Sequence, residues 1–158
     1  MRLARQTKNG WRYQLNEEEA ICLRSLLDQF PITPNATVKM SRTDGSPQAA
    51  TREKLLNESL AEHRKELQKQ ADSLMAADNL KPQDEGWLLC LNSEKREILL
   101  QILNDIRIGS WRALGELEDL ESETPYSTER ERMLYNLMHA AGFFEHELLN
   151  LEAAAKPT

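Results

Sequence analysis

The chain lacks long apolar runs and contains few cysteines, glycines and prolines. No apolar stretch approaches the roughly 20 residues that a membrane-spanning helix needs. Its two cysteines, Cys22 and Cys90, lie 68 positions apart and form neither a disulfide framework nor a metal-binding pattern. Glycine and proline occur six times each, and 29% of the residues are charged. This composition, with no signal-peptide stretch at the N-terminus, predicts a folded protein of the reducing cytoplasm.

Motifs that identify a reaction are also missing. The sequence has no H-E-x-x-H, no paired C-x-x-C, no P-loop, no G-x-G-x-x-G and no G-x-S-x-G. A di-metal helical bundle needs Glu-x-x-His pairs, and none of the three histidines has a glutamate three positions before it. The sequence therefore predicts no catalytic, cofactor-binding or metal-binding residues.

Positive charge is concentrated at the start of a chain whose net charge is −6. The first 15 residues contain Arg2, Arg5, Lys8 and Arg12 and no acidic residue, so the remainder carries −10. These four cations, here called the basic ribbon, could meet a phosphate backbone or an acidic partner. The other interpretation is that they protect an exposed strand from edge-to-edge pairing.

A β-hairpin is predicted for residues 1–15, because Asn9-Gly10 is a strong hairpin-turn signal. A helix should follow, with Asn16 as the N-cap and Glu19 completing a capping box. Pro31 should end it. Its expected buried stripe consists of Ala20, Leu23, Leu26, Leu27 and Phe30.

A linker is predicted for residues 31–48, which contain three prolines. Within this segment, Ser46 followed by Pro47 favours the start of a long helix. His63 lies in the middle of that helix's apolar stripe, and we expect it to be a core histidine held by a hydrogen bond. A buried pH-sensitive group is the alternative. The leucines of the stripe are Leu56, Leu60, Leu67 and Leu74.

One pattern, W-x-x-x-L-N-x-E, occurs twice, from Trp11 and again from Trp87. In both copies a predicted strand leads directly into a helix capped by an asparagine, Asn16 or Asn92, and the early glutamate favours the positive end of the helix dipole. Duplication and convergence on good capping chemistry both explain the repeat. The second strand, residues 87–91, is almost wholly apolar, which predicts burial on both faces.

Two further helices complete the prediction. The one that follows Asn92 keeps an apolar face to about Leu120. The last begins at Thr128, with Glu131 completing a capping box, and should run to about Ala154.

The expected fold is a single, mainly α domain spanning residues 1–158. It is a four-helix, bundle-like domain with a small N-terminal β-hairpin, one further short strand, and a turn at residues 121–127 between the last two helices.

The last helix has apolar or aromatic residues on two faces. Its main stripe consists of Leu134, Leu137, Met138, Ala141, Phe144, Leu148 and Leu151. At about 100° per residue, other residues project away from that stripe, and Trp111 leaves the main stripe of the preceding helix in the same way. Burial inside a bundle, a homodimer surface and a different protein partner all remain open. The predicted interface comprises Trp111, Tyr135, His139, Phe143 and His146.

Asn104, Asp105 and Arg107 lie on the polar flank of an otherwise apolar helix. Asn104 and Arg107 share a side, and Asp105 lies on the opposite edge. They could form a buried polar network that fixes helix register. The alternative is a partner-binding patch together with Trp111, since Arg and Trp are frequent hot spots.

The run Leu103-Asn104-Asp105-Ile106-Arg107-Ile108, with Leu114-Gly115, resembles a bacterial domain-of-unknown-function family. The family is best populated in actinobacteria, and its small helical members are often encoded beside the Clp protease adaptor ClpS. Leu91 with Glu94 and the run Ala61-Glu62-His63-Arg64 add to the resemblance, although relatives usually have an aromatic residue at the position of His63. Some members have been proposed as transcription regulators, so the resemblance implies regulation or protein interaction and no catalytic residues.

The sequence thus predicts a non-enzymatic cytoplasmic regulator or adaptor that acts by protein–protein contact. A transcription regulator that binds nucleic acid through the basic ribbon is the second candidate, and a small enzyme of unknown reaction is the third. The expected partner is a second copy of the chain, with another protein as the alternative. No membrane association and no cofactor are expected.

Overall fold

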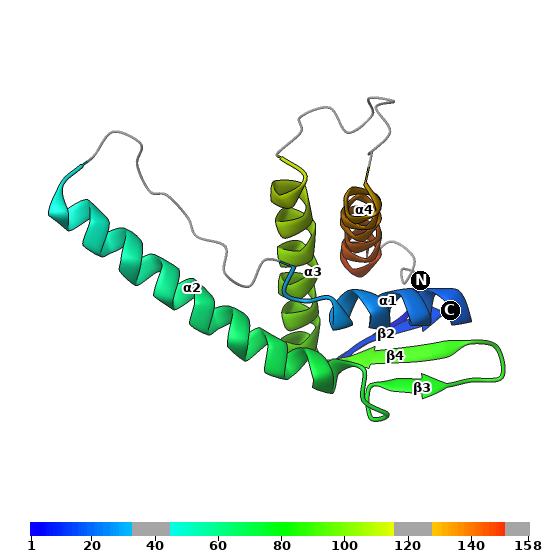
Figure 1. The fold of residues 1–158 in the computed structure, drawn as a ribbon. Coiled ribbons are helices and arrows are strands. Elements are labelled where there is room, and N and C mark those ends of the chain that lie inside the picture. The colour runs from blue at the N-terminus through cyan, green and yellow to red at the C-terminus, as the bar shows by residue number, and fades with distance from the viewer. Residues whose placement is uncertain (33–44, 116–127, 151–158) are drawn as a thin grey trace.

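The computed structural model of the chain describes residues 1–32, 45–115 and 128–150 (Figure 1). The predicted turn at 121–127 and much of the predicted linker lie outside these ranges. The described residues are mainly α with a small sheet, which confirms the predicted fold class. In chain order the elements are β1 (Arg2–Thr7), β2 (Gly10–Leu15), α1 (Glu17–Asp28), α2 (Pro47–Leu74), β3 (Leu80–Pro82), β4 (Trp87–Leu91), α3 (Ser93–Ala113) and α4 (Glu129–Leu149).

The strands form one antiparallel sheet in the order β1-β2-β4-β3. The hairpin and the β4 strand were predicted, whereas β3 was not, because three residues ending in a proline give no strand pattern. The prediction that β4 is buried on both faces is wrong. Only Leu89 and Leu91 are buried, and the alternate residues Leu88 and Cys90 stay partly exposed because none of the described helices covers their face.

The two copies of the repeated pattern pair with each other. In the antiparallel β2–β4 ladder, Trp11 of the first copy lies opposite Leu91 of the second, and Leu15 of the first lies opposite Trp87 of the second. Tyr13 and Leu89 meet at the centre and are fully buried. The repeat therefore forms the middle of the sheet, with each half completing the other.

A glycine precedes the tryptophan in each copy, and the close pairing requires it. Gly10 has φ 142° and Gly86 has φ 85°, a region that favours glycine. A Cβ atom on Gly10 would overlap the carbonyl oxygen of Leu91, and one on Gly86 would overlap that of Leu15. Each glycine thus lets the backbone of its copy approach the end of the other copy's strand.

Each of the two tryptophans makes a cation–π contact with an arginine from the helix that follows the other copy. Arg24 of α1 lies over the Trp87 ring, 4.8 Å from its centroid, and Arg96 of α3 lies over the Trp11 ring at 4.6 Å. Each helix thus places a cation on the aromatic ring of the other copy, an attractive arrangement for the ring quadrupole.

All three asparagine or threonine caps predicted from sequence are present. The Asn16 side chain accepts from the Glu19 amide at 2.8 Å, and Asn92 caps α3 at the same distance. Thr128 and Glu131 form the second capping box, as Asn16 and Glu19 form the first.

The prediction that α3 continues to about Leu120 is wrong, because the helix ends before Gly115. The helix ends at Ala113, and Leu114 is its C-cap. Gly115 follows with φ 92° and donates its N–H to the Arg112 carbonyl oxygen at 3.0 Å. A glycine with positive φ just past the cap is a common helix stop, since it satisfies terminal carbonyl groups.

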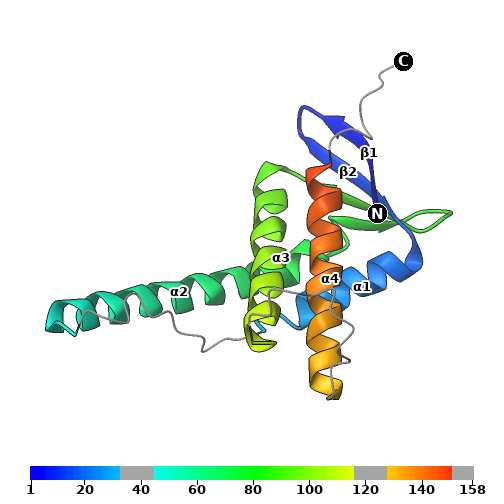
Figure 2. The same cartoon turned by 90° about the horizontal axis from the view of Figure 1, so that it is seen from above.

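Helix α2 begins at the predicted Ser46 cap but projects away from the other helices over most of its length (Figure 2). Its predicted apolar stripe is buried only toward the C-terminal end, at Leu67 and Leu74, while Leu56 and Leu60 remain partly exposed. The bundle-like packing is therefore formed by α1, α3 and α4.

His63 is exposed, so the prediction of a core histidine and its buried pH-sensitive alternative are both wrong. The neighbouring Arg64 forms an ion pair with Asp105 of α3 at 3.5 Å.

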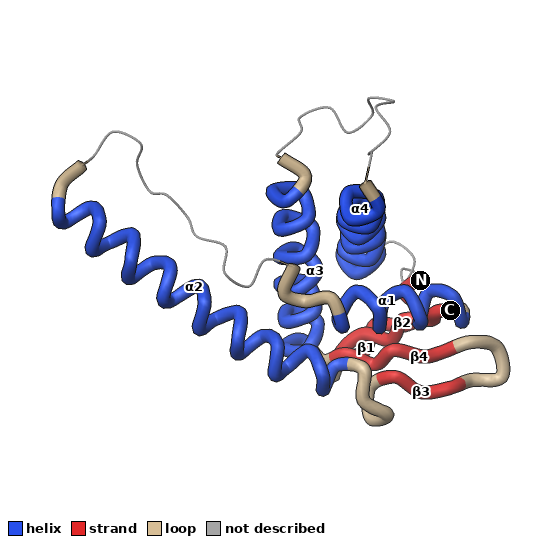
Figure 3. Tube along the Cα trace, viewed as in Figure 1, coloured by secondary structure: helices blue, strands red, loops and turns tan. Residues whose placement is uncertain are grey.

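The core lies between one face of the sheet and helices α1, α3 and α4 (Figure 3), and the C-terminal part of α2 adds Leu67, Ala71 and Leu74 to it. Every residue of the predicted α1 stripe is buried. The sheet contributes a row of buried residues that crosses all four strands: Leu3, Tyr13, Leu89 and Leu80.

Candidate functional site

Helices α3 and α4 lie side by side (Figures 1 and 2) and bury apolar residues along their seam. Ile106 on α3 and Met138, Ala141 and Phe144 on α4 are buried. The residues at the outer edge of this seam are only partly covered, and they form the candidate site.

A groove of about 600 Å³ opens along the outer edge of the α3–α4 seam. It is mainly apolar and includes an exposed phenylalanine, Phe143, a residue that is 44% exposed. We call it the α3–α4 groove. Its lining residues are Arg107, Ile108, Trp111, Met138, His139, Gly142 and Phe143.

Helical spacing brings these side chains together. Ile108 and Trp111 lie three positions apart on α3, and His139, Gly142 and Phe143 follow at the i, i+3 and i+4 positions on α4. Residues at those spacings share one helix face. Two adjacent helices therefore each contribute one stripe, and the groove lies between the stripes.

Gly142 gives the groove part of its depth, because it has no side chain. A Cβ atom at this position would lie 3.8 Å from Cδ of Arg107, which is ordinary van der Waals contact. A larger side chain at Gly142 would consequently extend into the groove without displacing the backbone.

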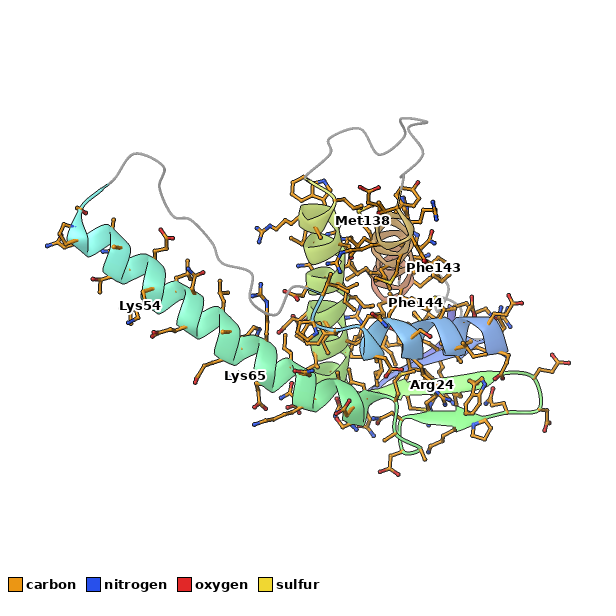
Figure 4. All side chains as sticks on the ribbon, in the orientation of Figure 1. Arg24, Lys54, Lys65, Met138, Phe143 and Phe144 are labelled. Carbon is orange, nitrogen blue, oxygen red and sulfur yellow. The ribbon has the colours of Figure 1, made fainter. Side chains whose placement is uncertain are left out.

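Phe143 is held at the groove by its neighbour in sequence, Phe144. Their ring centroids are 5.2 Å apart with an interplanar angle of 72°, a T-shaped contact that is favourable for aromatic pairs. Both residues are labelled on α4 in Figure 4. Phe144 is buried and fixed by the core. The exposed ring of Phe143 is therefore presented from a rigid base.

Arg107 makes the polar edge of the groove. Its Nη2 donates to Oδ1 of Asn104 at 3.1 Å, and its Nε lies 3.0 Å from Oε2 of Glu145 on α4. Burial raises the pKa of Glu145, and the Arg107 charge opposes that rise. The guanidinium is thus positioned by two partners, although much of it faces solvent.

The predicted polar network is real but lies at the surface. Asn104 and Arg107 share a side and are bonded, as predicted, while Asp105 pairs with Arg64 of α2 on the other edge. Asn104 and Arg107 are exposed, so the expectation of a buried network is wrong. They flank the groove that contains Trp111, which agrees with the alternative of a surface patch.

The structure brings three residues of the predicted interface together. Trp111, His139 and Phe143 line the groove, and the ring of Tyr135 contacts that of His139 in a tilted arrangement, with centroids 4.3 Å apart and an interplanar angle of 59°. His146 is exposed beyond the groove and does not line it. Phe143 is exposed, so the alternative that this face is buried inside the chain is wrong for Phe143.

Sequence reasoning missed two lining residues. Met138 was placed only in the core stripe, because a helical projection assigns each residue to one face, whereas its long side chain reaches both the core and the groove. Gly142 gave a usable signal, since a glycine inside a helix has a cost that another role can explain.

The basic ribbon does not contribute to the groove. Arg2, Arg5 and Arg12 lie on the sheet face that no described helix covers, and Lys8 lies in the β1–β2 turn. All four residues are exposed.

The two cysteines are both partly buried. Cys22 lines a second groove of about 380 Å³ between α1 and α4. Burial raises the pKa of the Cys22 thiol, which disfavours the reactive thiolate.

Within residues 1–32, 45–115 and 128–150, no cluster of three His, Cys, Asp or Glu side chains could hold a metal ion. None of the helices in those ranges has the length and apolar character needed to cross a bilayer. No family model, curated protein or solved structure matches the chain. The resemblance to the family encoded beside ClpS therefore stays a prediction.

Proposed function

We propose that this chain is a non-enzymatic cytoplasmic regulator or adaptor that binds another protein through the α3–α4 groove. The observation that carries the proposal is the exposed ring of Phe143 at the edge of a groove lined by Ile108, Trp111 and Met138. Contiguous apolar surface on folded proteins tends to mark contact sites.

The groove's composition suits protein contact. Trp and Arg, the residue types of Trp111 and Arg107, are frequent hot spots of protein interfaces. Met138 adds a flexible, polarisable surface that adapts to apolar side chains. Arg107 and His139 at the rim would supply polar contacts, as interface rims commonly do.

The partner that requires the fewest assumptions is a second copy of the chain. In a two-fold dimer the same surface serves both subunits, so Phe143 of each copy could enter the groove of the other. A groove that carries both an exposed aromatic ring and space beside it is self-complementary in this sense.

Light scattering at several protein concentrations tests the dimer. Phe143→Asp should give a folded monomer, because a carboxylate would be buried against the groove of the other copy. Ile21→Asp is the matched control, since Ile21 is an exposed apolar residue of α1 that is 55% exposed and does not line the groove. A native protein that stays monomeric at high concentration would show that the partner is not a second copy.

Capture of protein partners tests the broader proposal. Immobilised native chain should retain a partner from the lysate of its own host that both Trp111→Ala and Gly142→Leu lose. The first variant removes a groove wall and the second fills the groove. Retention of the same proteins by both variants would contradict a role for the groove.

Nucleic-acid binding, the second candidate, has less support. Single-stranded nucleic acids are usually held by aromatic side chains on which bases stack. The tryptophans of the sheet, Trp11 and Trp87, lie on the helix-covered face under Arg96 and Arg24, away from the basic ribbon.

A further inference from the structure

One face of the sheet is left uncovered by the described helices. Figure 3 shows α1, α3 and α4 on the opposite side. Residues directly opposite one another in antiparallel strands point to the same face. By register, one uncovered row consists of Arg2, Gln14, Leu88 and Lys81, and the next consists of Arg5, Arg12 and Cys90.

These two rows, here called the outer sheet face, have four cations and no acidic residue. Arg2, Arg5, Arg12 and Lys81 are all exposed. Arg2 donates to the Gln14 side chain at 2.8 Å. Within the part of the chain that the structure describes, no carboxylate pairs with any of the four. This concentration of positive charge lies on a chain whose net charge is −6.

Protection of sheet edges explains only part of this pattern. β1 and β3 are the edge strands, where Arg2, Arg5 and Lys81 would discourage pairing with other sheets. Arg12 lies on β2, an interior strand, and directly opposite Arg5. Like charges in that position destabilise a sheet. A bound anionic group between Arg5 and Arg12 would attract both cations and so offset their mutual repulsion.

We infer that the outer sheet face is a docking surface for an acidic segment of a partner protein, separate from the α3–α4 groove. Charge complementarity favours an anionic partner. Leu88 and Cys90 lie partly exposed among the cations, and they would contact apolar side chains interspersed with the acidic ones. The face has no aromatic residue for base stacking, so an acidic peptide fits it better than a single-stranded nucleic acid.

Fluorescence anisotropy with a short fluorescein-labelled peptide of alternating Glu and Val tests this inference. The native chain should bind the peptide at about 20 mM salt and more weakly at about 200 mM, because salt screens the exposed charges. The double variant Arg5→Glu/Arg12→Glu should reduce the affinity by about tenfold or more. Arg52→Glu/Lys69→Glu, which reverses two exposed cations of α2, is the matched control and should bind like the native chain.

Alkylation of Cys90 gives a second readout that leaves the cations of the face unchanged. In a Cys22→Ala background, iodoacetamide reacts only with Cys90, which lies beside Arg12 on the outer sheet face. The acidic peptide should slow that reaction, and a matched peptide of alternating Lys and Val should not.

Absence of peptide binding at low salt would overturn the inference. Equal binding by the Arg5→Glu/Arg12→Glu variant or unchanged Cys90 alkylation would overturn it as well. Labelled single-stranded and double-stranded DNA serve as competitors. Tighter binding of either DNA, with the same dependence on Arg5 and Arg12, would show that the partner is a nucleic acid and not an acidic protein.

Discussion

Arg96 donates a hydrogen bond from Nη2 to the carbonyl oxygen of Leu148 at 2.6 Å. The same guanidinium donates from Nε to the Tyr13 hydroxyl at 3.1 Å, and that hydroxyl also donates to the Leu148 oxygen at 3.2 Å. Leu148 is in the last turn of α4, where carbonyl groups lack helical partners. Arg96 thus connects α3, β2 and the end of α4.

Replacing Arg96 should destabilise the protein substantially. Arg96→Met would leave the Leu148 carbonyl with only the Tyr13 hydroxyl, and hydrogen bonds from charged donors contribute about 1.5–3 kcal/mol. We expect a loss of about 2 kcal/mol in the free energy of unfolding, measured by urea denaturation. Arg52→Met on the projecting part of α2 is the control and should change stability little. Equal losses in both variants would contradict the proposed connection.

Tyr13→Phe should cost less, about 1 kcal/mol, because it removes only a neutral hydroxyl. Burial raises the pKa of Tyr13 above its ordinary value of 10.0, and the bond from Arg96 opposes that rise. The phenolate is therefore disfavoured in the fold, so stability is present below pH 10 and is lost as the pH rises through the raised pKa. Alkaline denaturation should begin at a different pH in Tyr13→Phe, and identical alkaline profiles would contradict this.

The helix caps give a prediction with a close internal control. Asn92→Ala should lower the free energy of unfolding by about 1 kcal/mol without changing the fold, because it removes the acceptor for the Lys95 amide. Ser93→Ala, at the next position, keeps that acceptor and should be nearly neutral. A neutral Asn92→Ala in thermal melts would mean that the side-chain cap does not contribute.

Glycine substitutions should have opposite signs in different parts of the fold. Gly86→Ala forces a side chain into a positive-φ backbone and against the Leu15 carbonyl, so we expect a loss above about 1–2 kcal/mol. Gly142→Ala lies inside α4 with room for a methyl group, and helix propensity should raise stability by up to about 1 kcal/mol. Thermal melts of both variants beside the native chain distinguish the two cases, and two losses of similar size would refute this assignment.

Glu145 predicts a pH dependence of stability. Burial raises its pKa above the ordinary value of 4.5, so the folded state holds the proton more tightly than the unfolded chain does. The contribution of Glu145 to stability is therefore greatest below pH 4.5 and falls as the pH rises through the raised pKa. Glu145→Gln should remove this loss, so its stability relative to the native chain should increase across that window. Glu62→Gln on exposed α2 is the control, and parallel pH profiles for all three proteins would contradict the assignment.

Features that depend on local chemistry were predictable from the sequence. Asn16, Asn92 and Thr128 cap the helices they were expected to cap, because a side chain and an amide three residues later decide the outcome. The hairpin, whose turn residues are Lys8 and Asn9 with Gly10 beginning β2, and the α1 stripe follow from equally short-range patterns.

Features that depend on long-range placement were not predictable. The leucine spacing of α2 indicated burial along the whole helix, but burial requires a neighbouring element, and the buried leucines of α2 are Leu67 and Leu74, toward its C-terminal end. Likewise, helical projection placed Trp111, His139 and Phe143 off the main stripes but could not show that α3 and α4 would bring them into one groove. Pairing of Trp11 with Leu91 was hidden in the same way, although both copies of the pattern were visible.

Because the two copies pair with each other, the sheet can become stable only after both copies have been synthesised. β2 emerges with β1 as its only partner, and an isolated two-stranded hairpin is marginally stable in water. Its second partner, β4, begins 76 residues after Trp11, so β2 cannot gain that partner until the ribosome has synthesised β4. Until then the hairpin lacks the strand that pairs with it along Trp11 and Tyr13, so the sheet cannot be completed before the chain has been synthesised to Leu91.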